Sequence, residues 1–205
     1  ISYSHGGTPL TDDQKESLSI TFSDQENGGY SDELTRRDAT AGAVTYYYKV
    51  TDSSGNFGDF TGRFTATINP AELELSSKLP DNLTKPYDGN TALPGNEAPE
   101  DTSEGIVDSD RDKVKIEVSA EYADKNADAE KEIKVTYKIT FSGNSAGNYS
   151  YDGDKTVSTE SGSTVWTVTV SAGEPGTIEP KGVDVTLPEQ TMTYNGTESF
   201  TAGSA

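Results

Sequence analysis

Three aspartates at alternate positions, Asp108, Asp110 and Asp112, have the spacing that most resembles a metal site in this sequence. Carboxylates at alternate positions open the calcium loop of an EF-hand, which then needs glycine at its sixth position and glutamate at its twelfth. Lys113 and Ser119 stand at those positions, so an EF-hand is excluded. Two interpretations stay open, a looser calcium site between repeats and a solvated acidic loop.

Few other side chains suit catalysis. The chain has no cysteine, which excludes disulfides, thiolate nucleophiles and cysteine-ligated metals. Its one histidine, His5, lies in a glycine-rich turn, where an exposed turn residue is expected rather than a catalytic base. Asp152-Gly-Asp154 reads as a turn rather than as the carboxylate pair of a glycoside hydrolase. The sequence therefore predicts no enzyme, no catalytic residue and no bound cofactor.

Consecutive tyrosines at positions 46–48 place at least one ring on the outer face of a strand. Tyr47 is the one out of phase with Val44 and Val50, so it is the candidate ligand-binding residue. A ring on a flat sheet can stack on a sugar. The alternative is cross-strand packing between aromatic side chains, which sheets favour.

The charge of the chain limits its partners. Its 35 acidic and 16 basic residues give a formal net charge of -19. A phosphate backbone or an anionic lipid surface would be repelled, so nucleic acid is not an expected partner. No apolar run approaches the roughly 18 residues of a membrane helix, so no direct membrane insertion is expected. An acidity of this size suits a soluble, extracellular chain, and the alternative is that it only keeps the exposed faces of the strands well solvated.

A repeated joint sets the domain organisation. In both copies an isoleucine ends an alternating apolar run, a proline follows two residues later, and a second alternating run begins at once. Proline lacks the N–H that a central strand needs, so it indicates a joint between strands. A recurring joint is typical of tandem modules. The two copies are Ile68-Asn-Pro70 with Leu73, Leu75 and then Tyr87-Asp-Gly89, and Ile178-Glu-Pro180 with Val183, Val185, Leu187 and then Tyr194-Asn-Gly196.

Alternation with a period of two predicts the strands. Residues 31–38 fit either one turn of helix or a charged loop. Residues 94–112 are predicted to be an exposed loop, and residues 123–134 a charged connection. The predicted strands are carried by Leu18/Ile20/Phe22, Val44 to Val50, Phe60 to Ile68, Val114/Ile116/Val118, Val135 to Phe141 and Trp166/Val168/Val170.

These strands predict an all-β fold of tandem immunoglobulin-like β-sandwich modules. The alternative is a β-grasp arrangement with a short helix after Ser31 or in residues 123–134. We expect three parts, namely residues 1–70 as a repeat without its first strand, residues 71–180 as a second module, and residues 181–205 as the opening strand of a third repeat. The first module then has a vacant edge, to which Val183–Leu187 of a neighbouring copy could add as a strand.

Four landmarks of the second module occur in the order found in the YDG domain of bacterial surface proteins, which this module resembles. They are Lys85-Pro-Tyr-Asp-Gly-Asn-Thr91, Tyr122-Ala-Asp-Lys-Asn126, Thr140-Phe-Ser-Gly-Asn-Ser-Ala-Gly-Asn-Tyr149 and Gly176-Thr-Ile-Glu-Pro-Lys181. The first module is similar to the MBG and related Ig-like repeats, through residues 41–50, 55–59 and 66–70.

The resemblance implies an architecture and a location rather than an activity. Such repeats belong to long, secreted or wall-attached, adhesin-like proteins. The function expected is therefore a structural stalk at the cell surface or in the cell wall, with neighbouring repeats of the same chain as partners. The alternative is a binding module for a host or environmental glycan or protein.

Overall fold

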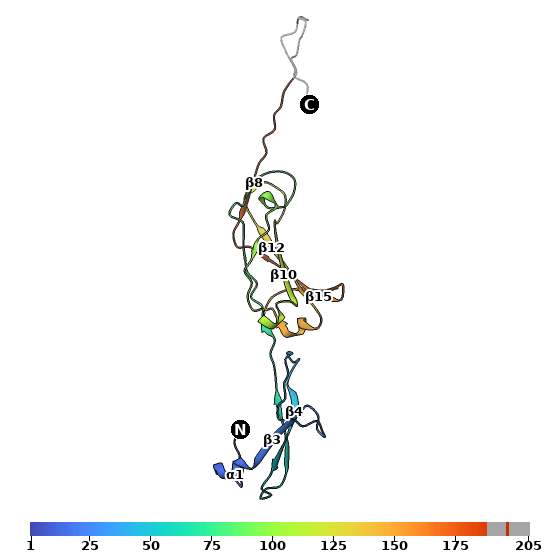
Figure 1. Cartoon of the computed structure of the whole chain (residues 1–205). Coiled ribbons are helices and arrows are strands. Elements are labelled where there is room, and N and C mark those ends of the chain that lie inside the picture. The colour runs from blue at the N-terminus through green and yellow to red at the C-terminus, as the bar shows by residue number, and fades with distance from the viewer. Residues whose placement is uncertain (188–195, 197–205) are drawn as a thin grey trace.

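The computed structural model describes residues 1–187 and 196, and shows sheets that follow one another along an extended molecule (Figure 1). No helix in these residues is both long and apolar enough to cross a membrane. The first elements are β1 Ser4–His5, β2 Thr8–Pro9, α1 Asp12–Glu16, β3 Leu18–Ser23, β4 Val44–Asp52 and β5 Phe60–Ala66. After Pro70 follow β6 Ala71–Glu72, β7 Ser77–Lys78, β8 Thr84–Pro86, η1 Pro94–Asn96, β9 Glu100–Asp101, η2 Asp108–Asp110, β10 Val114–Tyr122, β11 Asp128–Lys131, β12 Ile133–Phe141, η3 Ser145–Asn148, β13 Tyr149–Ser150, β14 Thr156–Glu160, β15 Ser163–Ser171 and β16 Gly176–Glu179.

The N-terminal sheet is antiparallel, with the strand order β3-β4-β5. Its register places Phe22 opposite Tyr48, and Tyr46 opposite Phe64. Because side chains alternate between the faces of a strand, the apolar residues of all three strands share one face. Tyr47 lies on the other face, between Ser23 and Arg63, as its phase predicts.

The helix of this region is not where the sequence suggested one. Residues 31–38 form no helix, so the charged loop is correct and the helical alternative is wrong there. The helix lies instead at Asp12–Glu16, where the Thr11 hydroxyl accepts a hydrogen bond from the Gln14 N–H and the Gln14 side-chain oxygen accepts one from the Thr11 N–H. This is a capping box, which satisfies two backbone donors at the start of a helix.

The central sheet is four-stranded and antiparallel, with the strand order β10-β12-β15-β14. Its middle strand, β12, alternates cleanly, so that Val135, Tyr137, Ile139 and Phe141 are all buried on one face. The opposite face is polar and carries the ion pair between Lys138 and Glu160. Period-two patterning thus gives this sheet one face in the core and one in water.

The opening segment, residues 71–87, covers the inner face of the central sheet. Leu73 is 2% exposed and lies in one core cluster with Tyr137 and Val168, and Leu75 and Leu79 pack against that cluster. The segment is not the continuous strand that its alternating leucines predicted. It pairs only briefly, in parallel with β13 through β6 and with β16 through β8, and antiparallel with β9 through β7.

A second core cluster lies at the other end of this region. It consists of Leu93, Tyr122, Ile133 and Ile178, of which Tyr122 and Ile133 are completely buried. The three-stranded sheet β11-β16-β8 holds it in place. Both clusters are built by residues after Pro70, so most of the buried apolar surface of the described chain belongs to this region.

The prediction for residues 123–134 was wrong in part. They contain β11 and the start of β12, although charged residues dominate them. Residues 128–131 form a strand because they pair with β16, although their charged sequence does not favour one. A bulge between Asp128 and Lys131 interrupts this pairing. A helix across residues 123–134 is therefore excluded, and with it the β-grasp alternative.

The all-β class predicted from the sequence is confirmed, with one short α-helix beside the strands. The immunoglobulin-like sandwich stays a prediction, since a four-stranded sheet faces an irregular opening segment in this structure rather than a regular second sheet. Residues 181–187 form no strand, and the rest of the predicted third repeat, residues 188–195 and 197–205, lies outside the described part.

Candidate functional site: the joint and the corner

The joint between the N-terminal sheet and the region after Pro70 is held by the joint segment, residues 38–40. Thr40 is 8% exposed, donates its backbone N–H to Ile68 O at 2.9 Å, and accepts the Ile68 N–H on its hydroxyl at 3.1 Å. These bonds fix the joint segment to the residue that immediately precedes the linking Asn69-Pro70.

The same joint segment contacts the second region through Asn148, at the end of η3. The Asn148 side-chain oxygen accepts the Ala39 N–H at 2.8 Å, and its amide donates to the Asp38 carboxylate at 3.1 Å. Both hydrogen-bonding ends of one amide are therefore used across the joint. This arrangement ties the two regions together beside the connecting chain.

A cavity of about 470 Å³ lies beside these bonds, lined among others by Arg37, Ile68, Lys113 and Asn148. Lys113 forms an ion pair with Asp110 at 2.7 Å. The pKa of Lys113 is raised, first by this hydrogen bond and charge, with a smaller contribution from Asp38 across the joint. Asp38 therefore attracts Lys113 as well as Asn148.

Of the three aspartates with calcium-like spacing, Asp110 lines this cavity. Asp108 pairs with Arg111 at 2.8 Å, and Asp112 is exposed. Asp110 is buried, and its pKa is lowered mainly by the hydrogen bond from Lys113. Among the described residues no three potential ligands are grouped so that they could hold a metal ion.

The calcium hypothesis stays a prediction. If these aspartates bind calcium in the folded state only, millimolar calcium should raise the melting midpoint of the chain, because such a ligand stabilises the folded state by mass action. The measurement is a thermal melt in calcium and in chelator. Equal midpoints would remove the hypothesis.

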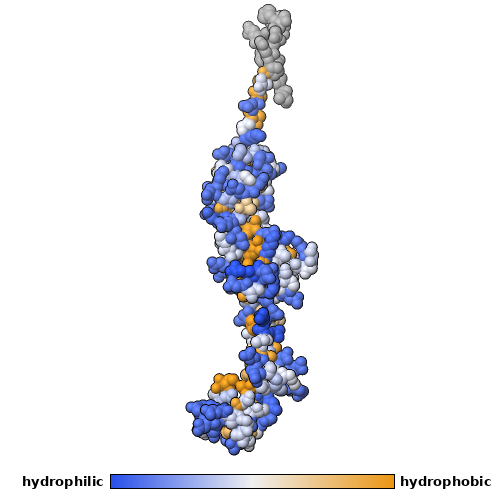
Figure 2. Space-filling view, viewed as in Figure 1, coloured by the Kyte–Doolittle hydropathy of each residue, from blue (hydrophilic) through white to orange (hydrophobic). Residues whose placement is uncertain are grey.

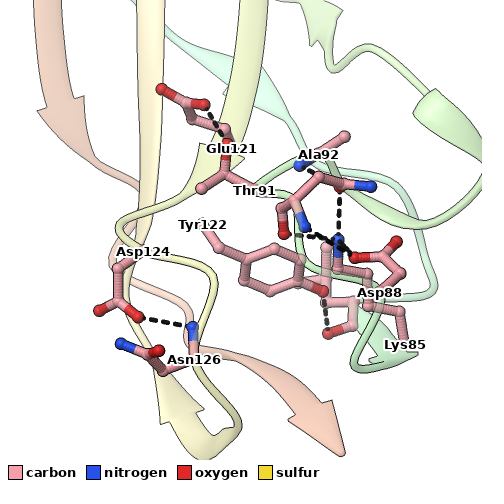
Figure 3. Close-up of polar contacts among 10 residues, drawn as sticks. Lys85, Asp88, Thr91, Ala92, Glu121, Tyr122, Asp124 and Asn126 are labelled. Atoms are coloured by element: carbon pink, nitrogen blue, oxygen red, sulfur yellow. Dashed lines mark hydrogen bonds and ion pairs between the residues drawn. The ribbon is translucent and has the colours of Figure 1, made fainter.

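The second polar site is the corner formed by the Lys85-Pro-Tyr-Asp-Gly-Asn90 motif (Figure 3). Lys85 is 6% exposed, and its ammonium donates to Asp88 Oδ1 at 2.9 Å, Asn90 O at 3.0 Å and Asn90 Oδ1 at 2.8 Å. The pKa of Asp88 is lowered, first by this hydrogen bond from Lys85. The lysine thus fastens a turn from inside rather than facing a ligand.

Tyr122 closes the corner from β10. Its hydroxyl donates to Leu83 O at 2.8 Å, its ring lies 5.4 Å from the Lys85 ammonium, and burial raises its pKa. A cation over an aromatic face is attracted by the ring quadrupole. A second buried lysine, Lys131, pairs in the same manner with Asp124 at 2.9 Å.

Sequence reasoning found these motifs but not their roles. Asn148 and Asp38 are 110 residues apart, and no local pattern links them. The one available signal was the recurrence of a Gly-Asn-aromatic triplet at residues 55–57 and 147–149. Tyr47, the candidate ligand-binding residue, lies on the polar face of the N-terminal sheet. No contact in the structure tests its proposed role.

Short strands, a proline joint and lysine-fastened corners define this chain as a protein of the all-β class. Residues 69–159 match the family model of the YDG domain, so the chain contains a YDG domain that begins at the joint. Strands β15 and β16 follow the matched residues and complete the sheets and core clusters of this domain. Neither the curated proteins nor the solved structures gave a match.

Proposed function

We propose that this chain is a non-enzymatic stalk segment of a bacterial cell-surface, adhesin-like protein, exposed outside the cell. The observation that carries the proposal is the joint, where the joint segment fastens the N-terminal sheet to the YDG domain on both sides of Pro70. A fixed joint between successive modules keeps them in line, as an extended spacer requires (Figure 1). The MBG-like character of residues 1–70 belongs to this proposal.

The path of the chain through the YDG domain supports the same role. The opening segment enters at one end, and β16 leaves at the other (Figure 1). β8 and β16 run parallel, with bonds of 2.8 Å from Thr177 N to Leu83 O and from Tyr87 N to Glu179 O. Tension on the two ends therefore slides β8 against β16, and their hydrogen bonds must break together rather than one after another.

The joint gives a direct test. Asn148→Ala removes both side-chain bonds to the joint segment, so the two regions should sample a wider range of orientations. In small-angle X-ray scattering the maximum dimension should become less sharply defined and the mean radius of gyration should fall. The free energy of unfolding of the YDG domain should change by less than about 1 kcal/mol, which is the contribution of one typical hydrogen bond.

Asn144→Ala is the matched control, since Asn144 is an exposed asparagine of the same turn whose side chain makes no hydrogen bond to the described residues. It should scatter like the parent chain. If Asn148→Ala and the parent chain give identical scattering, the joint does not hold the modules in line, and the stalk proposal loses its support.

A second candidate function is a binding module for a host or environmental glycan or protein. One observation favours it, a groove of about 600 Å³ on the N-terminal sheet, lined in part by Tyr48, Phe60 and Phe64. Aromatic rings in a concave site suit sugars as well as apolar side chains. A glycan array that is silent for the chain would remove the sugar alternative.

A further inference from the structure

The N-terminal sheet has an apolar face that its own chain covers only in part. Phe22, Tyr46, Tyr48 and Phe64 lie on this face, and Tyr46, which is 6% exposed, is the one large hydrophobic residue of the sheet that is buried. Phe60 and Phe64 are 58% and 40% exposed. Contiguous exposed apolar side chains are unusual on a soluble protein and mark a place where another surface binds.

The groove of about 600 Å³ lies along this face. Residues from the start of the chain, among them Ile1, Tyr3 and Leu10, form its second wall. Figure 2 shows hydrophobic residues gathered at the surface of this lower part of the molecule. The groove is therefore open, apolar and walled on two sides.

The YDG domain shows what covers the equivalent face there. Tyr46 opposite Phe64 in the N-terminal sheet corresponds to Tyr137 opposite Val168 in the central sheet. Val168 is 1% exposed, whereas Phe64 is 40% exposed. The central sheet is covered by the opening segment, whose Leu73 lies in the same core cluster as Val168.

The chain contains a second segment of the opening type, and this one covers nothing in the described structure. Aligning Pro180 with Pro70 places Val183 at the position of Leu73, and Val185 at that of Leu75. Val183, Val185 and Leu187 are 83%, 77% and 76% exposed. They form an apolar stripe on the extended tail, residues 180–187, seen in Figure 2 at the far end of the molecule.

We propose that the groove on the N-terminal sheet binds Val183–Leu187 of a second copy of this chain. In the YDG domain the Leu73 N–H donates to Ser150 O at 2.8 Å. The equivalent bond in the complex joins the Val183 N–H to Gly58 O, because Gly58 follows the first Gly-Asn-aromatic triplet as Ser150 follows the second. The segment thus adds main-chain bonds at its start and apolar side chains along the groove.

The charges around the groove favour the same direction of binding, in which the start of the tail segment lies at Gly58. Lys181 then comes beside the turn between β4 and β5, which is flanked by Asp52, the last residue of β4, and by Asp59, whose carboxylate pairs with Lys49 at 2.8 Å. A basic residue at the entrance of an acidic turn favours one direction of binding over its reverse.

Such an interface is heterologous, since the groove and the tail lie at opposite ends of the molecule (Figure 1). Heterologous contacts that do not close into a ring build open chains of copies. Head-to-tail association in this manner would continue the line of modules from one molecule to the next.

The test is sedimentation velocity over a concentration series up to about 1 mM. This upper limit equals the effective concentration at which a short linker would present such a segment to a groove in its own chain. The parent chain should associate as concentration rises. Val183→Asp with Val185→Asp should weaken association at least about tenfold, because both side chains leave water in the complex. Thr186→Asp, at the alternate position of the same tail, should leave association within about twofold.

The groove is tested by Phe64→Asp, with Thr65→Asp on the opposite face as its control. The decisive experiment mixes Phe64→Asp with the tail double variant. Each alone should stay monomeric, but the mixture should form a one-to-one complex, since one variant keeps its tail and the other its groove. A parent chain that stays monomeric, or a tail double variant that associates like the parent, would overturn the proposal even if Phe64→Asp failed to fold.

Discussion

Leu73→Ala should lower the free energy of unfolding of the YDG domain by about 3 kcal/mol, within the usual range for a leucine truncated in a core. Leu73 is 2% exposed and lies among Tyr137, Ile139 and Val168, so the truncation leaves a cavity that a packed sheet cannot close. The measurement is urea unfolding followed by tryptophan fluorescence. Trp166 is the one tryptophan of the chain and lies in the same cluster, so the signal reports on this domain alone.

Val183→Ala is the matched control, at the corresponding position of the second joint. Val183 is 83% exposed, so its truncation should change stability by less than about 0.5 kcal/mol at low micromolar concentration. Equal effects of the two substitutions would mean that the opening segment does not stabilise the central sheet. The comparison with Phe64 and Val168 on which the docking proposal rests would then fail as well.

The long strands were predictable from the sequence because their apolar residues alternate over seven or more positions. Val44 to Val50 and Val135 to Phe141 both became central strands, with neighbours on each side. A half-buried strand imposes this period, and a helix cannot satisfy it. The same reasoning placed Tyr47 on the face opposite Tyr46 and Tyr48.

Other elements could not be predicted because their conformation depends on distant partners. The opening segment bonds in turn to Ser150, Glu104 and Asp101, so no single register holds along it. β11 has charged residues at three of its four positions and forms because β16 offers a free edge. α1 is different, since its Thr11-x-x-Gln14 capping box could be read locally. Its five residues carry no apolar stripe, so the periodicity of the sequence did not predict a helix there.

The polar contacts divide in the same way. The corner at residues 85–90 was visible as a motif, because the hydrogen-bond partners of Lys85, namely Asp88 and Asn90, lie within six residues of it. The joint was not visible, since Asn148 and the joint segment meet only after both regions have folded. A sequence motif therefore predicts the local conformation of its own residues. The distant residues that the motif contacts are known only from the structure.

Lys85→Met should destabilise the YDG domain by about 2 kcal/mol. Methionine keeps most of the volume of the side chain but provides no donor, so Asn90 O and Asn90 Oδ1 lose a charged partner. Removing one partner of a buried polar contact costs the desolvation of the group left behind, about 1–3 kcal/mol. The attraction between the ammonium and the Tyr122 ring is lost at the same time.

Two measurements separate this explanation from a loss of packing. The pKa of Asp88, which Lys85 holds below its ordinary value, should rise in the variant and can be followed by NMR titration. Lys134→Met, an exposed lysine on β12, should change stability by less than about 0.5 kcal/mol. If Lys85→Met is as mild as Lys134→Met and the pKa of Asp88 does not move, the lysine does not fasten the corner. The corner would then be held by another physical cause, such as the turn conformation of Gly89, which has a φ of 83°.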